Sequence, residues 1–600
     1  MFADQYIQIA AFIGSSFVYG VGENVQQRLS VSETIQSLML FIDNRNFSHA
    51  FYDNLEYDEL VPHNLEYYIT WPLFARDQHV DSKDLHGVFP NNQNLYGVYP
   101  FYMGIESDYN AHGVLILNSN AQEITFGPAP QIIYRTIGGL LDIYFFPGPT
   151  PEDVLKQYLA FVGYPMLPPY WGLGFQGWEQ LPKYIEQIHS ENMHIVLIFD
   201  PAVQVDGQPF ARGLHSGAKF VEWERDDQVP HSIQDLYPLA KDTKIMLGVA
   251  WPDKHVSFPD FSDAMTTMWW MKEIERFHQQ VNFDGIWLDM NEPSNFGTDE
   301  INPWYFTNTD HPNLEPLMCP LSGNDSFYDM PPYETYAVYI YGPNSTLSSK
   351  TLCMLARTKD GRFYDTKNLY GLHEVIATQM ALQVITSNRT LVVTRSSYPS
   401  AGHYAGHWLG DNSATWDGLR TSIIGIQEFN LFGVPYIGAD ICGFSGNTTE
   451  ELCLRWQQLG AFYTFSRNHN EKGAASQQPT VWPRVAAATR QANLFRYYYL
   501  PYLYTLHYYV SVSGGAIIRP LFFEFPYDDA AHEYDTEFMW GPAMLIAPVI
   551  VEGWTEVYAY LPREATWYSL REFDYGMRAL NGFSFISAPF DQLIPVFVRG

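Results

Sequence analysis

The stretch FDGIWLDMNEPSNF, residues 283–296, decides the fold of this chain. A short apolar run, predicted as the strand Gly285–Asp289, ends in a polar cluster that also holds Asn291 and Glu292. In a parallel β/α barrel the carboxyl ends of the strands face the active site, so Asp289 is placed for chemistry. By spacing alone the simpler interpretation is that it bonds loop or helix-start amides, as aspartate commonly does after a strand.

Around this stretch, short apolar runs alternate with amphipathic helices from about residue 168, which predicts parallel β/α architecture. The strand candidates are Gly172–Gln176, Ile195–Asp200, Gly285–Asp289, Leu391–Arg395, His407–Asp411, Val434–Gly438 and Phe462–Ser466. The helix candidates are Lys183–Glu191, Ser262–Gln280, Leu372–Thr386, Trp416–Asn430, Glu450–Gly460 and Val485–Val510.

These strands number seven, whereas a closed (β/α)₈ barrel needs eight, since strand number, tilt and shear are linked. Only 18 residues separate Gln176 from Ile195, which is enough for one turn and one helix. Two crossovers with an intervening strand need several tens of residues. We therefore expect the barrel to lack its second strand unit.

Strand-like runs separated by turn residues flank the barrel segment on both sides. HGVLILNSNAQEITFGPAPQIIYRT predicts an N-terminal β-sandwich over residues 1–165. The barrel domain, 166–513, carries two long insertions near 201–261 and 293–369, of the kind that shapes a substrate site. RPLFFEFP and MLIAPVIVEG predict a second β-sandwich over 514–600, which we expect to be incomplete.

The composition excludes several classes of protein. A formal net charge of -32 on 600 residues argues against nucleic-acid binding, because phosphate contacts need clustered Lys and Arg. A hydrophobic content of 46% excludes a disordered chain. Aromatic residues make up 16%, and rings that stack on sugars are one use for them, although large aromatic cores explain most.

The cysteines and glycosylation signals favour the secretory route. The four cysteines fall as two local pairs, Cys319 with Cys353 and Cys442 with Cys453, which permits three connectivities and shows no zinc-ligand spacing. Asn-x-Ser/Thr sequons begin at Asn46, Asn324, Asn344, Asn388 and Asn447. No apolar run is long enough for a membrane span. The amino terminus lacks the features of a signal peptide, so we expect a fragment of a longer precursor.

A second carboxylate follows another strand in RSSYPSAGHYAGHWLGDNSATW, residues 395–416. Asp411 could belong to the cap of the helix that begins near Trp416. It could also pair with Asp289 across the barrel mouth. Two carboxylates on separate strands, one of them kept protonated by burial and by the neighbouring charge, are what glycoside cleavage requires.

WLDMNEPSNF, GHWLGDN, GADICGF and SRNHN resemble sequence blocks of the glycoside hydrolase family 31 α-glucosidases, in the group that includes lysosomal and intestinal enzymes. The blocks follow the family's order, and the resemblance runs from FADQYIQI at residues 2–9 to the last residue. It implies retaining hydrolysis of terminal, non-reducing α-linked glucose from maltose, oligosaccharides, glycogen or starch. It also implies a lysosomal, extracellular or cell-surface location, and no metal or organic cofactor.

Position by position, the resemblance makes Asp289 the nucleophile, Asp411 the acid/base and Glu292 a supporting residue. The residues matching substrate-binding groups are Arg395, Asp440, His469, Trp251, Trp287, Met290, Phe444, Ile198 and Asp200. Singly, several have a simpler interpretation: Trp287 as core, Arg395 as an ion-pair partner, His469 as a satisfied buried histidine. The resemblance further implies disulfides Cys319–Cys353 and Cys442–Cys453.

The chain departs from the family after Gln176, where the family continues through helix one into a second strand with an aspartate that binds the cleaved glucose. A buried charged hydrogen bond of that kind contributes about 1.5–3 kcal/mol. Its loss, with strand edges left unpaired, motivates an alternative. In that alternative the chain is an impaired or inactive homologue, acting as a carbohydrate-binding or structural subunit.

Overall fold

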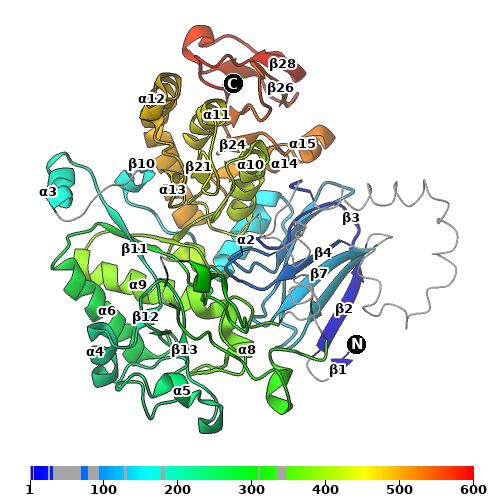
Figure 1. Cartoon of the computed structure of the whole chain (residues 1–600). Coiled ribbons are helices and arrows are strands. Elements are labelled where there is room, and N and C mark those ends of the chain that lie inside the picture. The colour runs from blue at the N-terminus through cyan, green and yellow to red at the C-terminus, as the bar shows by residue number, and fades with distance from the viewer. Residues whose placement is uncertain are drawn as a thin grey trace.

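The structure is a computed structural model in which antiparallel sheets lie at both ends of the chain and a β/α unit lies between them (Figure 1). It describes all residues except 1, 4–5, 24–27, 31–68, 79–93, 128–130, 177–182, 309–310, 312, 334 and 336–345. The sequons at Asn46 and Asn344 lie outside the described residues.

Two antiparallel sheets form the N-terminal part. The first has the order β1-β2-β8-β7-β4 and the second the order β3-β5-β6-β9. Their strands are β1 Phe2–Ala3, β2 Tyr6–Phe12, β3 Ser15–Gly20, β4 Ile69–Leu73, β5 Phe101–Glu106, β6 Ala111–Ile116, β7 Gln122–Gly127, β8 Gln131–Thr136 and β9 Ile143–Phe146. Trp71 and Phe126 of the first sheet share one buried apolar cluster with Val18 and Val114 of the second. Helix α2 (Pro151–Val162) then packs on β6 and leads toward the barrel.

Parallel strands make the central unit. One sheet has the order β11-β15-β18-β19-β20, and another has the order β10-β22-β21. Their bounds are β10 Phe175–Gln176, β11 Val196–Phe199, β15 Gly285–Leu288, β18 Leu391–Thr394, β19 Gly406–Trp408, β20 Ile437–Gly438, β21 Asp440–Ile441 and β22 Ser466–Asn468. Only Ala439 separates β20 from β21, so the two sheets form one series from β11 round to β10. Within the described part of the chain, no ladder joins β10 to β11.

The helices of this unit are α3 Lys183–Ser190, α6 Ala264–His278, α9 Tyr370–Thr386, α10 Trp416–Leu431, α11 Glu450–Gly460, α12 Pro483–Tyr498 and α13 Leu500–Ser513. The prediction of a single helix over Val485–Val510 is wrong, because α12 ends at Tyr498 and α13 begins at Leu500. Pro501 lies in the first turn of α13, where its missing N–H costs nothing, but inside a continuous helix it would remove a hydrogen bond.

One strand prediction also needs correction. The segment predicted as Phe462–Ser466 is a turn, and β22 begins only at Ser466. Phe462 and Tyr463 donate their backbone N–H groups to Leu459 and Gly460, so the end of α11 holds these residues in a turn. The other six predicted strands each overlap an observed strand that is shorter than predicted, and one of these, β19, begins one residue before the predicted His407.

The two long insertions form small elements beside the barrel. Near 201–261 these are β12 Val203–Gln204, α4 Gln208–Ser216, α5 His231–Gln234, β13 Leu247–Gly248 and β14 Val256–Ser257. Near 293–369 they are β16 Arg357–Thr358, β17 Gly361–Arg362 and α8 Phe363–Thr366. The disulfide Cys319–Cys353 closes a loop of the second insertion.

The C-terminal part has a five-stranded sheet of order β23-β24-β25-β29-β27 and a two-stranded sheet β26-β28. Its elements are β23 Ile518–Arg519, α14 Leu521–Glu524, α15 Asp529–Glu533, β24 Phe538–Trp540, β25 Met544–Ile546, β26 Glu556–Leu561, β27 Trp567–Ser569, β28 Gly582–Ser587 and β29 Val596–Arg599. None of the helices described in the chain has the length and apolar character to cross a membrane.

Arg496 of α12 fastens the strand β10 to the rest of the series. Its fully buried guanidinium donates to the carbonyls of Leu173, Ala461, Tyr463 and Thr464. These carbonyls come from the segments that lead into β10 and β22. One side chain therefore satisfies four buried acceptors where the segments before β10 and β22 meet.

We expect Arg496→Met to lower the free energy of unfolding by at least about 3 kcal/mol, because it leaves several buried carbonyls without donors. Chemical denaturation followed by tryptophan fluorescence would measure this. Arg490→Met, on an exposed position of the same helix, is the control and should change stability by less than about 0.5 kcal/mol. Equal stability of the two variants would contradict the assignment.

Candidate active site

Asp289 stands where β15 ends. Its backbone N–H still donates to Phe199 of β11 over 3.1 Å, so the residue is held by the ladder. The next residue, Met290, has a φ of 58°, in the left-handed region, and its N–H donates to Asp289 Oδ1 over 2.8 Å. The chain thus turns sharply after Asp289. The Asp289 carboxylate is left 15% exposed at the barrel mouth.

Arg395, which follows the neighbouring strand β18, binds the carboxylates of this region. Its Nε lies 3.0 Å from Asp289 Oδ1, and Nε and Nη2 each lie 2.9 Å from an oxygen of Glu292. Its Nη2 is also 3.3 Å from Asp77, a residue of the N-terminal part. Burial by itself would lower the pKa of Arg395, but Asp289, Asp77 and Glu292 raise it well above its usual value.

Asp411 lies beyond the end of β19. Its N–H donates over 3.2 Å to the hydroxyl of Tyr96, whose ring also lies under the Arg395 guanidinium at 4.8 Å. Burial raises the pKa of Asp411 well above its usual value, and the charge of Asp289 adds to this although Arg395 opposes it. The cap of α10 is Thr415, which accepts from the N–H of Gly418, so Asp411 does not serve as that cap.

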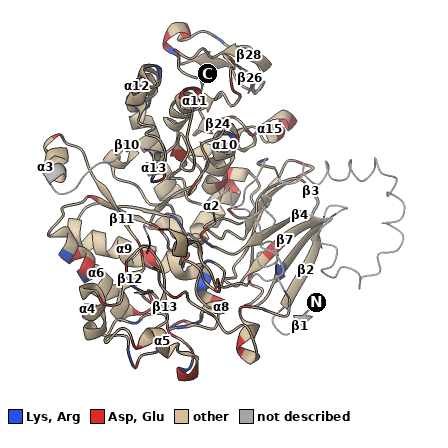
Figure 2. Cartoon of the chain, in the orientation of Figure 1, with Lys and Arg blue, Asp and Glu red and all other residues tan. Residues whose placement is uncertain are grey.

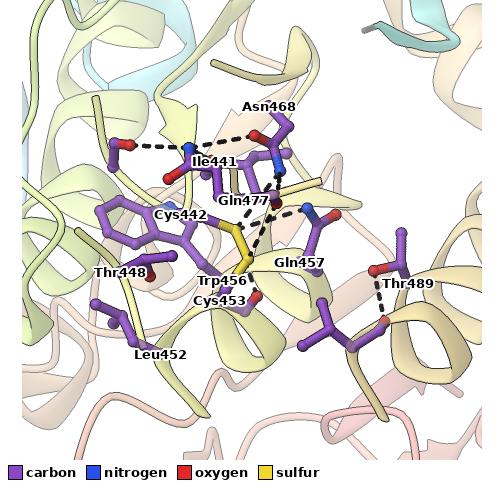
Figure 3. The surroundings of a disulfide bond; sticks show 12 residues. Ile441, Cys442, Thr448, Leu452, Cys453, Trp456, Gln457, Asn468, Gln477 and Thr489 are labelled. Carbon is purple, nitrogen blue, oxygen red and sulfur yellow. Dashed lines mark hydrogen bonds between the residues drawn. A yellow bond between two sulfur atoms is a disulfide. The ribbon is translucent and has the colours of Figure 1, made fainter. Parts of the chain in front are cut away.

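Asp440 begins the strand β21 and is paired with Arg467 of β22. Arg467 Nη2 and Nε lie 2.5 and 3.1 Å from Asp440 Oδ1, whereas Oδ2 has no partner among the residues described. Burial raises the pKa of Asp440 to about 6, although Arg467 lowers it. The disulfide Cys442–Cys453 ties the loop after β21 to α11, as Figure 3 shows, and so fixes the backbone next to Asp440.

Aromatic rings surround this ion pair. The Arg467 guanidinium lies 4.4 Å from the Trp287 ring, and His469 meets Trp287 edge-on at 5.4 Å. Phe444 lies 5.2 Å from His469. Burial, together with the Arg467 charge, lowers the pKa of His469 to about 3, so the imidazole is neutral at any pH where the protein would work.

The remaining predicted residues lie at the side of β11 and at the rim. Ile198 is paired in register with Trp287 and is 44% exposed, because β11 ends the sheet. Asp200, after β11, has its pKa raised by burial and then by the charge of Asp289. Trp251 is 55% exposed and packs edge-on against Phe296 at 5.1 Å. Because Phe296 belongs to the second insertion, Trp251 links the two insertions at the rim.

Three contributors were missing from the sequence prediction. Asp77 and Tyr96 belong to the N-terminal part, and nothing in their local sequence pattern indicates a role at the barrel mouth. Arg467 lay within the block SRNHN that was used for the resemblance, so its sequence signal was present. In the structure Arg467 is the charged partner of Asp440.

Comparison with known families identifies the domains of the chain. Residues 175–506 match the glycosyl hydrolases family 31 TIM-barrel domain, and residues 514–600 match the glycosyl hydrolase family 31 C-terminal domain. The chain belongs to glycosyl hydrolase family 31. The resemblance found in the sequence is thereby confirmed, as is a multidomain organisation with a TIM-barrel domain.

Relatives in family 31 include intestinal sucrase-isomaltase of Oryctolagus cuniculus, 35% identical over 95% of this chain and 30% of that protein. Lysosomal alpha-glucosidase of Rattus norvegicus is 37% identical over 80% of this chain and 51% of that protein. This chain thus spans between about a third and about half of the length of these relatives.

Solved structures of low identity share the fold. A glucosidase II alpha subunit matches with a TM-score of 0.74 at 21% identity, over 99% of this chain and 61% of that chain. A family 31 dextranase of Flavobacterium johnsoniae matches with a TM-score of 0.72 at 18% identity, over 100% of this chain and 67% of that chain.

We expect Glu292→Ala to destabilise the protein by about 3–5 kcal/mol, because it removes one partner of a buried ion pair and with it the acceptor of two hydrogen bonds from the Arg395 guanidinium. Denaturant unfolding would measure the loss. Asp227→Ala removes an acidic partner of the exposed Arg225 and is the matched control, with an expected change below about 1 kcal/mol. A Glu292→Ala protein as stable as the control variant would show that Arg395 does not depend on Glu292.

Proposed function

We propose that this family 31 chain is a retaining exo-α-glucosidase with Asp289 as nucleophile and Asp411 as acid/base. The observation that carries the proposal is the opposite electrostatic setting of the two carboxyls. Asp289 forms an ion pair with the Arg395 guanidinium, whose Nε lies 3.0 Å from Asp289 Oδ1. Asp411 is half-buried and forms no ion pair among the described residues, and its raised pKa favours the protonated form.

In the first step Asp289 attacks C1 of the terminal glucose while Asp411 gives its proton to the departing glycosidic oxygen. The C1–O bond breaks and a β-glucosyl ester forms on Asp289. In the second step Asp411, now ionised, takes a proton from water, which attacks C1 and releases α-glucose. We expect the two carboxyl groups to lie about 5–5.5 Å apart when sugar is bound.

The glucose ring would be held between the charged groups and the aromatic wall. In this proposal Arg395, Asp440 and His469 bind its hydroxyls, with His469 as a neutral partner. Trp287 would face its apolar side. Met290, Phe444, Trp251, Ile198 and Asp200 complete the proposed lining, and Glu292 supports Arg395.

The proposed architecture is an N-terminal β-sandwich at 1–165, a barrel at 166–513 that lacks its second strand unit, and an incomplete C-terminal β-sandwich at 514–600. The ladder ends at β10 and β11 support the position of the missing unit. The exposed side chain of Ile198 lies on that same side. The groove wall there would therefore be lower than in a closed barrel, and longer oligosaccharides would have room.

We propose the secretory route, ending in the lysosome, at the cell surface or outside the cell. Two relatives are named as lysosomal and intestinal proteins. The sequons at Asn324, Asn388 and Asn447 lie on intermediate or exposed positions, where a glycan could be attached. Two disulfides agree with an oxidising compartment.

We expect Asp289→Ala to reduce maltose hydrolysis at least about 10⁴-fold, because it removes the group that forms the glycosyl ester. Release of glucose would be measured, with Asp227→Ala as the unaffected control. Mass spectrometry after treatment with a cyclitol epoxide should place the label on Asp289. A wild-type protein that binds maltose without releasing glucose would instead support the binding-only alternative.

We expect Asp411→Asn to slow maltose hydrolysis by about 10²–10⁴-fold, since general acid catalysis contributes that much. Cleavage of a dinitrophenyl α-glucoside should slow less in the first step, because its leaving group needs no proton. In the wild type, maltose turnover should fall as the pH rises through the raised pKa of Asp411, because the acid then loses its proton. Equal losses on both substrates would contradict the assignment.

A further inference from the structure

A second cleft lies away from the candidate active site, between α12 and the end of the β26-β28 sheet. Its volume is about 640 Å³. The residues that matter for its chemistry are Arg484, Arg490, Gln491, Thr555, Phe590 and Asp591. None of them belongs to the candidate active site. Figure 1 places α12 and β28 at the top of the molecule, and Figure 2 shows basic residues (blue) on α12.

One wall of the cleft is fixed to the barrel by Arg455 of α11. This buried side chain donates through Nη2 to the carbonyls of Trp554 and Ala588, each over 2.8 Å. The N–H of Ala588 donates to the carbonyl of Thr555 over 2.7 Å and continues the β26-β28 ladder. The guanidinium also lies 4.4 Å from the Phe590 ring. The wall that carries Thr555 and Phe590 is therefore held in place before any ligand arrives.

The other wall is one face of α12. Positions 484, 487, 491 and 494 recur at helical spacing, so their side chains point to the same side. They span about 15 Å at a rise of 1.5 Å per residue. Polar Arg484 and Gln491 alternate along this face with apolar Ala487 and Leu494. The wall thus offers hydrogen bonds and apolar contacts in turn over a long distance.

This alternation fits a polyhydroxylated chain better than a compact anion. A sugar ring presents apolar C–H faces and hydroxyl groups that both donate and accept. Arg484 and Arg490 can only donate, and Asp591 on the opposite wall can only accept. A site for an anion would not place a carboxylate in its lining.

We propose that this cleft is a second binding site for α-linked glucose chains, which holds a long substrate while its non-reducing end is cleaved elsewhere. The proposal rests on the proposed α-glucosidase function for the identity of the chain. Binding at two sites of one molecule raises the effective concentration of substrate ends. Maltose is too short to profit from this, whereas glycogen or starch would.

The first test compares long and short substrates in the double variant Arg484→Ala/Gln491→Ala. Both substitutions place alanine, which has a high helix propensity, on an accessible helix face, so the double variant should fold. We expect the half-saturating glycogen concentration to rise about fivefold, as the loss of two hydrogen bonds implies, with maltose kcat/KM unchanged. Arg276→Ala, on an exposed position of α6, is the control and should change neither. An unchanged glycogen value, or an equal change for maltose, would overturn the proposal.

A second test does not depend on catalysis. In native gel electrophoresis, glycogen cast in the gel should retard the wild type and the Asp289→Asn variant alike, because Asp289 lies outside the cleft. The double variant Arg484→Ala/Gln491→Ala should be retarded less than both, when the mobility of each protein is compared with its own mobility in a gel without glycogen. Retardation of that double variant equal to the wild type would overturn the proposed cleft. Retardation without glucose release from the wild type would overturn the proposed activity and leave the cleft standing.

Discussion

The buried guanidinium of Arg395 is the interaction on which the candidate site depends. Asp289, Glu292 and Asp77 all lie within 3.3 Å of its nitrogens. Buried carboxylates repel one another strongly unless a cation or protonation intervenes. One arginine cannot neutralise all of the carboxyls here, since Asp411 and Asp200 add two more. Burial raises the pKa values of Asp411 and Asp200, and the charge of Asp289 raises them further, so protonation of these two carboxyls relieves the surplus.

The geometry of parallel strands brings these groups together. β15, β18 and β19 are neighbours in one sheet, so Asp289, Arg395 and Asp411 emerge at the same edge. The N-terminal part then covers this edge with Asp77 and Tyr96. Tyr96 contacts both Arg395 and the backbone of Asp411, so the position of the proposed acid depends on residues about 300 positions earlier in the chain.

The side of the barrel between β10 and β11 has a different character. β10 is held by β22 and by the Arg496 hydrogen bond to Leu173 just before it, whereas β11 is held by β15. Among the residues that the structure describes, β10 and β11 are thus each paired with another strand on one side only. Asp440, which lies away from β11, is enclosed by its ion pair with Arg467 and by the disulfide-bound loop. The site is therefore rigid on one side and more exposed at Ile198.

The sequence by itself determined the β/α alternation, the family, and the placing of Asp289 and Asp411 after strands, because period and strand-end polarity are local properties of the chain. The prediction missed the division between α12 and α13, although Pro501 is a local signal for it, and it placed β22 too early because the end of α11 holds Phe462 and Tyr463 in a turn. Only the tertiary structure decided that Asp77 and Tyr96 join the site, and that Thr415, and not Asp411, caps α10. Contacts between distant segments leave no periodic trace, and the protonation of a carboxyl depends on what surrounds it in space.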